Sequence, residues 1–526
     1  MPSYLSPGVY VEEVESGSRP IEGVGTSVAA FIGFAQKGPF HEPTLITNWT
    51  QFTTVFGDFV EGTYLASSVH GYFANGGGIC YVIRIGGAEE DRDGAGAGAG
   101  AGAAEAPVVG PTAQLGPYVV KALPGVTGEI TVEVADPEGE EPPQDVFTLI
   151  VKRDGTVVET YPSVTTKRSK DNVATQVRAR SRLIRLEEPG KGAAPARPET
   201  QSVTLAAPGG EPGSGAGVVA VPEALSADSY VGDPDRRTGF GGLEAVEEVT
   251  MVAAPDLMSA YQRGALDLET VISVQRGLIT HCEAMGDRIA ILDPPPGLSP
   301  RQIKSWREET TGFDSKYATL YYPWIKVFDP AVGRDAFVPP SGHVAGVWAR
   351  NDETRGVHKA PANEVLRGAV GLQTQITKGE HDLLNPIGLN CIRAFPGRGI
   401  RVWGARTLAD DPSWRYLNVR RLFNYLEESI LAGTQWVVFE PNDDALWARV
   451  RRTISAFLVN EWRKGALFGL TPDEAFYVKC DRETNPPESI DAGQVICEVG
   501  VAPVKPAEFV VFRLAQLSAG SGGIDE

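Results

Sequence analysis

The stretch "TSVAAFIGFA" at residues 26–35 decides the fold class, because it is a continuous, largely apolar run. Such a run predicts a strand that is buried on both faces of a sheet. A second buried strand is predicted for "ICYVIRI" at 79–85. Between them, residues 63–77 have helical spacing and end in a cluster of glycines, which is a strong stop signal. The order strand, helix, strand predicts a parallel sheet covered by helices.

The same pattern returns after a long interruption, at "VTMVAAPD" (249–256). Residues 26–90 and 228–394 are therefore predicted to form one α/β core, with a parallel or mixed sheet and helices on both faces. The further elements expected in its second half are a helix at 268–286, a strand at 288–295, a helix at 299–311 and a strand at 316–327.

The interruption itself, residues 91–227, has a different composition. It begins with the low-complexity run "GAGAGAGAGAAEA" at 94–106, which is typical of a flexible linker. Short β-forming runs follow, and Asp154-Gly155 between two of them predicts a hairpin. We interpret 91–227 as an inserted, mostly β domain that lies on the outside of the parent fold.

The character of the sequence changes again near residue 395. Two strong helices are predicted around 412–432 and 442–464, and short strands are predicted in "EAFYVKCD" and "QVICEVGVAPV". Residues 395–506 are thus expected to form an α+β C-terminal domain. Residues 1–25 and 507–526 are expected to be extended terminal arms.

Each arm contains one lone β-forming run. The first is "SPGVYVEEVESG" at 6–17, with Val9, Tyr10, Val11 and Val14; the second is "EFVVFRL" at 508–514, with Phe509, Val510, Val511 and Phe512. Neither run lies in a predicted domain core. From the residues alone, each run could pair within its own chain or with another chain.

Composition and charge exclude several classes of function. The net charge of −19 and the pI of about 4.9 argue against general binding to nucleic acid or to an anionic membrane. The five cysteines are scattered without a C-x-x-C pair, so a reducing compartment is expected and a disulfide framework is not. We expect no signal peptide at the basic-poor start and no membrane span, because no apolar run approaches about 18 residues.

Motifs for catalysis or cofactor binding are also absent from the sequence. It contains no phosphate-binding G-x-x-x-x-G-K-[ST], no G-x-S-x-G and no H-E-x-x-H, and its six histidines are dispersed. We therefore predict no catalytic, cofactor or metal site. The alternative is an α/β enzyme with a β-rich accessory domain, whose site would include residues such as Asp256, Asp293 and Arg334 at strand ends.

Several segments in a fixed order resemble one family. They are "SPGVYVEEV" with "SVAAFIGFAQKGP", "FGDFVEGTYLASSVHGYFANGGGICYVIRI", "VTMVAAPD", "KYATLYYPWIKV", "VPPSGHVAGVWARNDETRGVHKAPAN" and "NPIGLNCIRAFPGRGIRVWGARTL" leading into "YLNVRRLFNYLEESI". In these segments the chain resembles the contractile tail sheath proteins of phage tails, R-type pyocins and extracellular contractile injection systems. The resemblance covers about residues 1–90 and 228–515, whereas the insert takes no part.

The resemblance implies a structural subunit rather than an enzyme. Such subunits stack as hexameric rings in a helix around an inner tube protein, together with baseplate and tail terminator or cap proteins, and they contract to drive the tube through a target envelope. The resemblance further implies that both terminal runs add strands to the C-terminal sheet of neighbouring subunits, with acceptor strands in "AFYVKC" and "QVICEV". It implies no cofactor, no nucleic acid and no direct insertion into a membrane.

The family also contacts its tube through a helix of the C-terminal domain. The helix at 442–464, which opens with Asp443-Asp444, is one candidate, because Arg449, Arg452 and Arg463 lie away from its apolar face. The preceding helix, with Arg420 and Arg421, is the other candidate, and a solvated basic face is the alternative to both. A second alternative function is another helical or surface-layer structural protein. The resemblance places assembly in a bacterial cytoplasm, as part of a phage tail or a phage-tail-like particle.

Overall fold

The computed structural model describes residues 20–86 and 225–513, and shorter segments between 112 and 205. The chain folds as two compact units: one contains residues 1–89 and 219–526, and the other contains residues 90–218. Each unit has its own hydrophobic core. The run Val9, Tyr10, Val11 and Val14 lies outside the described residues.

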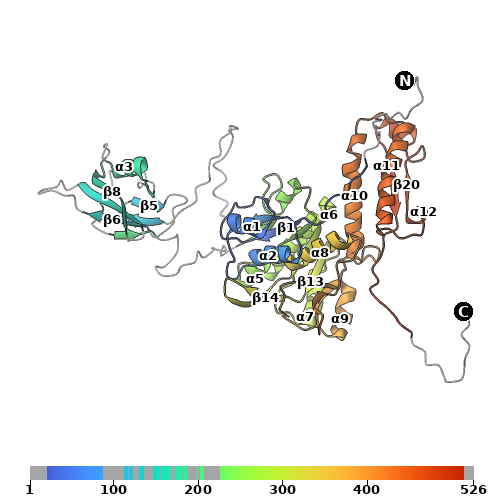
Figure 1. Ribbon diagram of the computed structural model, residues 1–526, viewed down its shortest axis with the longest axis horizontal. Helices are drawn as coiled ribbons and strands as arrows, with labels where there is room; N and C mark the ends of the chain where they lie inside the picture. Colours follow the sequence, from blue (N-terminus) through green and yellow to red (C-terminus); the bar gives the residue numbers. More distant parts are fainter. Residues whose placement is uncertain are drawn as a thin grey trace, which may run out of the picture. The chain divides into compact units, whose positions relative to one another are not determined.

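The larger unit is built on a mixed sheet, to which β1 and β13 in Figure 1 belong. Among the described residues its strand order is β16-β19-β18-β13-β12-β11-β1-β3-β2. The six strands from β18 to β3 run parallel, and antiparallel strands lie at both edges. The strands are β1 (Ala29–Gly33), β2 (Thr44–Ile46), β3 (Cys80–Arg84), β11 (Met251–Ala253), β12 (Ile289–Leu292), β13 (Ala318–Tyr322), β16 (Glu364–Val365), β18 (Leu389–Phe395) and β19 (Gly399–Val402).

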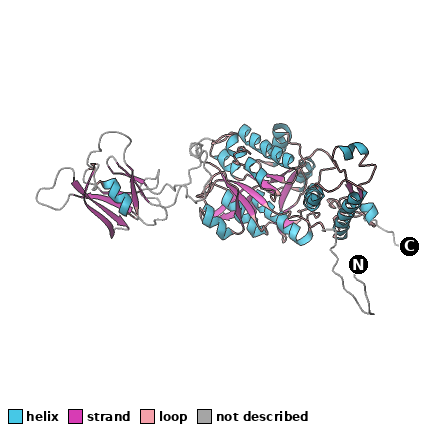
Figure 2. Ribbon diagram, turned by 90° about the horizontal axis from the view of Figure 1, so that it is seen from above, coloured by secondary structure: helices cyan, strands magenta, loops and turns pink. Residues whose placement is uncertain are grey.

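Helices cover both faces of this sheet (Figure 2). Along β1, Ala30 and Ile32 face one core, whereas Ala29 and Phe31 face the other, as the pleat of a strand requires. The predicted mixed α/β fold is therefore confirmed. On one side lie α5 (Asp256–Gln262), α6 (Leu268–Met285) and α7 (Pro300–Ser305), and on the other lie α1 (Trp49–Phe56), α2 (Leu65–Asn75) and α8 (Ser341–Arg355).

Local sequence explains where these helices begin and end. α2 stops at Gly76, whose φ of 115° suits glycine and lets its N–H bond to the last turn. α6 begins at Asp267, whose carboxylate accepts a hydrogen bond from the backbone N–H of Thr270.

The boundary predicted between the core and the C-terminal domain, at residues 394 and 395, is wrong. It falls inside β18, which pairs antiparallel with β19 from Ile392↔Val402 to Phe395↔Gly399. Because this hairpin extends the large sheet, the core continues to at least residue 402. A smaller sheet beside it contains β14 (Ile325–Asp329), β15 (Arg334–Val338) and β17 (Gly371–Leu372), and α9 (Lys378–Leu384) follows.

The C-terminal region centres on two long helices, α10 (Leu417–Thr434) and α11 (Asp444–Arg463), which share a hydrophobic core (Figure 1). Leu446, Val450, Ile454, Phe457 and Leu458, the apolar face expected from the spacing of α11, are all buried there. The remaining elements are α12 (Pro472–Ala475), β20 (Phe476–Lys479), α13 (Pro487–Asp491) and β21 (Glu498–Val501).

The smaller unit is mostly β. Two antiparallel sheets, β10-β6-β7-β8 and β4-β5-β9, enclose a separate core with the short helix α3 (Val173–Arg180). The strands that flank Asp154-Gly155 pair antiparallel, with Arg153 opposite Thr156. The strands are β4 (Thr112–Leu115), β5 (Tyr118–Ala122), β6 (Ile130–Ala135), β7 (Val146–Arg153), β8 (Thr156–Thr165), β9 (Ile184–Glu187) and β10 (Ser202–Thr204).

Candidate assembly site

The first component of the candidate site is the small sheet of β20 and β21. The two strands pair antiparallel from Phe476↔Val501 to Lys479↔Glu498, and no third strand joins them in the part of the chain that the structure describes. Phe476, Val478 and Val501 lie on one face of the sheet and pack on the core of α10 and α11, while Tyr477 on the other face is exposed. Open sheet edges of this kind can receive a strand from another chain.

The second component is the apolar run near the C-terminus. Phe509, Val510, Val511 and Phe512 are all exposed, between 68% and 84% of their surface, and none of them belongs to a strand. Four β-favouring apolar residues in a row are rarely left in water without a partner. The described part of the run thus does not pair within its own chain.

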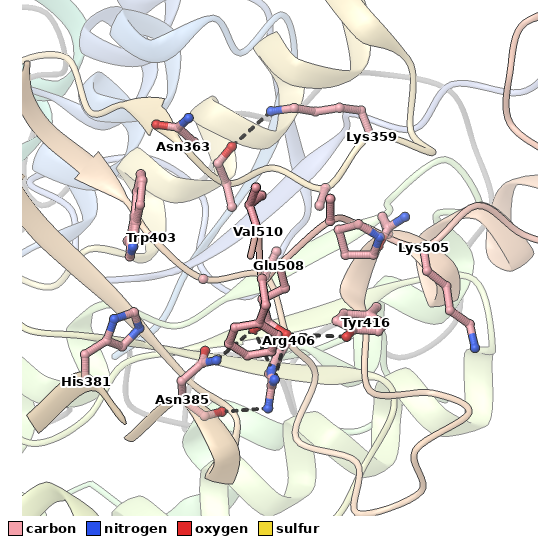
Figure 3. Close-up of a pocket in the computed structure, with 18 of the residues that line it drawn as sticks. Lys359, Asn363, His381, Asn385, Trp403, Arg406, Tyr416, Lys505, Glu508 and Val510 are labelled. Atoms are coloured by element: carbon pink, nitrogen blue, oxygen red, sulfur yellow. Dashed lines mark hydrogen bonds and ion pairs between the residues drawn. The ribbon is translucent and has the colours of Figure 1, made fainter. Parts of the chain in front are cut away.

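Residues 504–508, here called the C-terminal root, fix this run to the α/β core (Figure 3). The Glu508 carboxylate accepts two hydrogen bonds from Arg406, Nε to Oε1 at 2.9 Å and Nη2 to Oε2 at 2.6 Å. Asn385 donates a third bond at 2.7 Å. Burial alone would raise the pKa of Glu508, but the bonds from Arg406 and Asn385 and the charge of Arg406 outweigh burial, so the pKa is lowered.

The C-terminal root lies over a cavity of about 880 Å³. Its wall carries more basic than acidic side chains, although the chain as a whole is acidic. Lys359 is paired with Glu364 and Arg406 with Glu508. The other charged residues on the wall are Arg355, Lys378, Asp382, Arg393 and Lys505.

Residues 21–26, here called the N-terminal root, are fixed differently. Ile21 is buried in the core of α10 and α11, and the backbone N–H of Val24 donates to Ser429 Oγ at 3.1 Å. Gly23 lies so close to α10 that a Cβ there would fall 2.0 Å from the Tyr425 hydroxyl. The first arm therefore leaves from the helical C-terminal region.

The tube contacts predicted for Arg420 and Arg421 are wrong, because both side chains are buried within their own chain. Arg421 forms an ion pair with Asp352 at 2.5 Å and also donates to the carbonyl of Thr26 in the N-terminal root. Arg420 donates to Asn424 and to Glu427. Its guanidinium lies 4.5 Å from the centre of the Trp414 ring.

The candidates on α11 differ in their availability. Arg452 and Arg463 are exposed, and contact with a tube stays a prediction for both. Arg449 is already engaged, since it pairs with Glu440 at 3.2 Å and lies 4.6 Å from the centre of the Trp436 ring.

Two of the three residues named for the rival enzyme, Asp256 and Asp293, are buried and have structural partners. Asp256 accepts backbone hydrogen bonds from Phe34, Tyr64 and Leu65, and burial raises its pKa to about 7. The Asp293 carboxylate accepts from the backbone N–H of Ser341, and burial raises its pKa to about 7 as well. Arg334 is exposed on β15. In the described residues no group of three or more histidines, cysteines or carboxylates could hold a metal ion, and no helix is apolar and long enough to span a bilayer.

Two family models match adjoining parts of the chain. "Phage tail sheath protein central domain" matches residues 241–408, and "Phage tail sheath C-terminal domain" matches residues 409–516. The tail sheath protein of Vibrio phage KVP40 is 26% identical over 297 residues, which are 53% of this chain and 41% of the relative. A putative prophage major tail sheath protein of Pseudomonas aeruginosa is 26% identical over 46% of this chain and 62% of its own length. The chain thus spans about half the length of the curated relatives it matches.

Solved structures match over nearly the whole chain. The helical sheath of the anti-feeding prophage in its contracted state has a TM-score of 0.59 at 24% identity, over 97% of this chain and 99% of that one. The contracted PVC sheath complex of an extracellular contractile injection system has a TM-score of 0.56 at 23% identity, over 98% and 99%. At these identities the similarity shows a shared fold.

Proposed function

This chain belongs to the phage tail sheath family, and from that premise we propose that it is a structural subunit of a contractile tail sheath. Subunits polymerise helically, as stacked hexameric rings, around an inner tube. They then rearrange into a wider and shorter helix, which drives the tube through a target envelope. The work comes from the free-energy difference between two packings of rigid bodies, so no nucleotide or cofactor is required.

One observation carries the proposal: the exposed apolar run from Phe509 to Phe512 belongs to a chain that also has an open two-stranded sheet. Burial of a side chain of this size contributes roughly 1.5–3 kcal/mol, so pairing the run with a neighbour is strongly favourable. The donor and the acceptor are different surfaces. A contact between unlike surfaces builds rings and open helices rather than closed dimers.

In the finer form of the proposal, two arms enter the sheet of a neighbouring subunit. One is the run Val9, Tyr10, Val11 and Val14, and the other is Phe509 to Phe512. β20 and β21 offer the edges. Baseplate and terminator or cap proteins close the two ends of the sheath, and the particle assembles in the bacterial cytoplasm before release.

Deletion of residues 1–17 tests the strand exchange. The shortened subunit is expected to stay folded, because the N-terminal root from Ile21 onward is kept, and to lose polymerisation. Negative-stain electron microscopy of the protein, alone and with its candidate tube protein, gives the result. If the shortened chain still formed long sheaths, the proposed strand exchange by the first arm would be wrong.

A matched pair of variants tests the second arm by the same microscopy. Val511→Asp places a charge in the apolar run, and Val370→Asp places one at another exposed valine of the core. Both proteins are expected to fold, but only Val511→Asp is expected to stop assembly. Hollow cylinders from both variants would contradict the proposed role of Phe509 to Phe512.

We further propose that α11 faces the inner tube through Arg452 and Arg463, whose charge suits an acidic tube surface. The double variant Arg452→Glu and Arg463→Glu is expected to lower tube binding at least tenfold in co-sedimentation while the subunit stays folded. Arg334→Glu, an exposed change on β15, is the control. Equal tube binding by both variants would remove α11 as the contact.

Two other results would favour the alternative functions. Assembly into sheaths without any tube protein would favour a surface-layer protein, and turnover of a small substrate would favour the rival enzyme.

A further inference from the structure

Two cysteines face each other across the small sheet. The register of β20 and β21 ends with Lys479 opposite Glu498. Cys480 directly follows β20 and Cys497 directly precedes β21, so continuing the register by one step sets them opposite each other. Both are free thiols, and each shifts the pKa of the other. Directly opposed residues have Cβ atoms about 4.5–5.5 Å apart, close to the roughly 3.5–4.5 Å of a disulfide.

The surroundings hold this pair in place. Asn485 bridges the strand ends, since its Nδ2 donates to the Asp481 carbonyl at 3.1 Å and to the Ile496 carbonyl at 2.9 Å, and its Oδ1 accepts from the Ile496 N–H at 2.6 Å. On the other side, Arg451 of α11 donates to the Cys480 carbonyl at 2.6 Å. Burial raises the pKa of both thiols, that of Cys497 to about 12, and the charge of Arg451 opposes this rise.

A reagent has a route to the pair. Cys497 is only partly buried, and Cys480 lines a surface cavity of about 400 Å³ together with Arg451. The other three cysteines, Cys80, Cys282 and Cys391, are buried in the α/β core. Cys480 is itself buried, so Cys497 is the thiol that a reagent reaches first.

We propose that Cys480 and Cys497 form a reversible disulfide by exchange with a small disulfide such as oxidised glutathione. The Cys497 thiolate attacks one sulfur of the glutathione disulfide, and the first glutathione leaves. The Cys480 thiolate then attacks the Cys497 sulfur of the mixed disulfide, and the second glutathione leaves. The two cysteine thiols are oxidised, one glutathione disulfide is reduced to two thiols, and the two cysteine protons end on them.

The bond would close a loop that contains α13 and fix the register of β20 against β21. This chemistry goes beyond the proposed function and does not depend on it. Its consequence for assembly does rest on that function. In a particle that leaves a reducing cytoplasm, the disulfide would form and cross-link the sheet of β20 and β21 that accepts the arms.

The test uses the full chain, reduced and then incubated with oxidised glutathione at mildly alkaline pH. The products are alkylated, digested without reductant and examined by mass spectrometry. We expect a peptide pair joined through Cys480 and Cys497, lighter than the separate peptides by two hydrogen atoms, while Cys80, Cys282 and Cys391 stay reduced. No reaction, glutathione adducts alone, or bridges to the core cysteines would overturn the proposal.

Thermal unfolding gives a second readout on the isolated chain. The oxidised protein is expected to unfold a few degrees higher than the reduced protein, because the closed loop restricts the unfolded chain. Cys497→Ser is expected to abolish this difference. Equal unfolding temperatures for the oxidised and reduced wild-type proteins would remove the stapling effect. Neither readout involves polymerisation, so failure here is separate from failure of the arm deletions.

Discussion

The roots of the two arms are fixed to the same molecule in different ways. At the N-terminal root, Arg421 and Asp352 form an ion pair whose side chains are 4% and 5% exposed, and Arg421 also holds the Thr26 carbonyl. At the C-terminal root, a single carboxylate, Glu508, carries the contacts to Arg406 and Asn385 and is 20% exposed.

The N-terminal root is therefore held by a buried ion pair of the core, whereas the C-terminal root is held by a partly exposed ion pair. Breaking a fully buried ion pair leaves an uncompensated charge in a site that water does not reach. A partly exposed pair is rehydrated when it opens, so its release costs less. The comparison predicts that the N-terminal root is the harder of the two to open.

The largest expected effect is at the N-terminal root. Asp352→Ala is expected to lower the free energy of unfolding by about 3 kcal/mol, because it leaves the Arg421 guanidinium buried and unpaired. The Thr26 hydroxyl, which donates to Asp352 at 2.7 Å, also loses its acceptor. Chemical denaturation followed by circular dichroism measures the change.

Asp444→Ala is the matched control for this prediction. Asp444 pairs with Arg482 at 2.8 Å, but both side chains are mostly exposed, so no measurable change in stability is expected. If Asp352→Ala lowered the free energy of unfolding no more than Asp444→Ala, the N-terminal root would be held no more firmly than a surface contact. The proposed difference between the two roots would then be wrong.

The elements of the core were predictable because each one has a local signature. The apolar run at 26–35 becomes the buried strand β1, the glycines after residue 75 end α2, and the spacing of α11 gives its buried face. Such signals need only neighbours in the sequence, and the mixed α/β fold follows from their order.

The roots were not predictable in this way, because their partners are distant in the sequence. Glu508 meets Arg406, 102 residues earlier, and Arg421 meets Asp352, 69 residues earlier. The sequence showed only that Arg420 and Arg421 lie on a predicted helix, which made them candidates for contact with a partner. The aromatic ring of Trp414 and the Asp352 carboxylate cover them only in the folded chain. The predicted domain boundary was misplaced for a similar reason. The sequence changes character near residue 395, but this position lies in the β18–β19 hairpin, which belongs to the core.

The smaller effect is expected at the C-terminal root, where Glu508→Gln removes the charge that faces Arg406. We expect a loss of about 1 kcal/mol, because the pair is partly hydrated and one amide oxygen can still accept a bond. Hydrogen exchange of residues 504–508 measures it locally, with faster exchange in the variant. Asp382→Asn, on the wall of the same cavity, is the control and is expected to leave exchange unchanged.

The pH dependence sharpens this last prediction. The pKa of Glu508 is lowered in the folded chain, so its contribution is complete above the ordinary glutamate pKa and is lost as the pH falls through the lowered value. Acidification should therefore lower the protection of residues 504–508, measured as exchange relative to the unfolded chain at the same pH, in the wild type and have little further effect on protection in Glu508→Gln. An equal acid response in both proteins would show that another group controls the C-terminal root. If the C-terminal root opened only when the whole chain unfolds, it would be as firmly held as the N-terminal root.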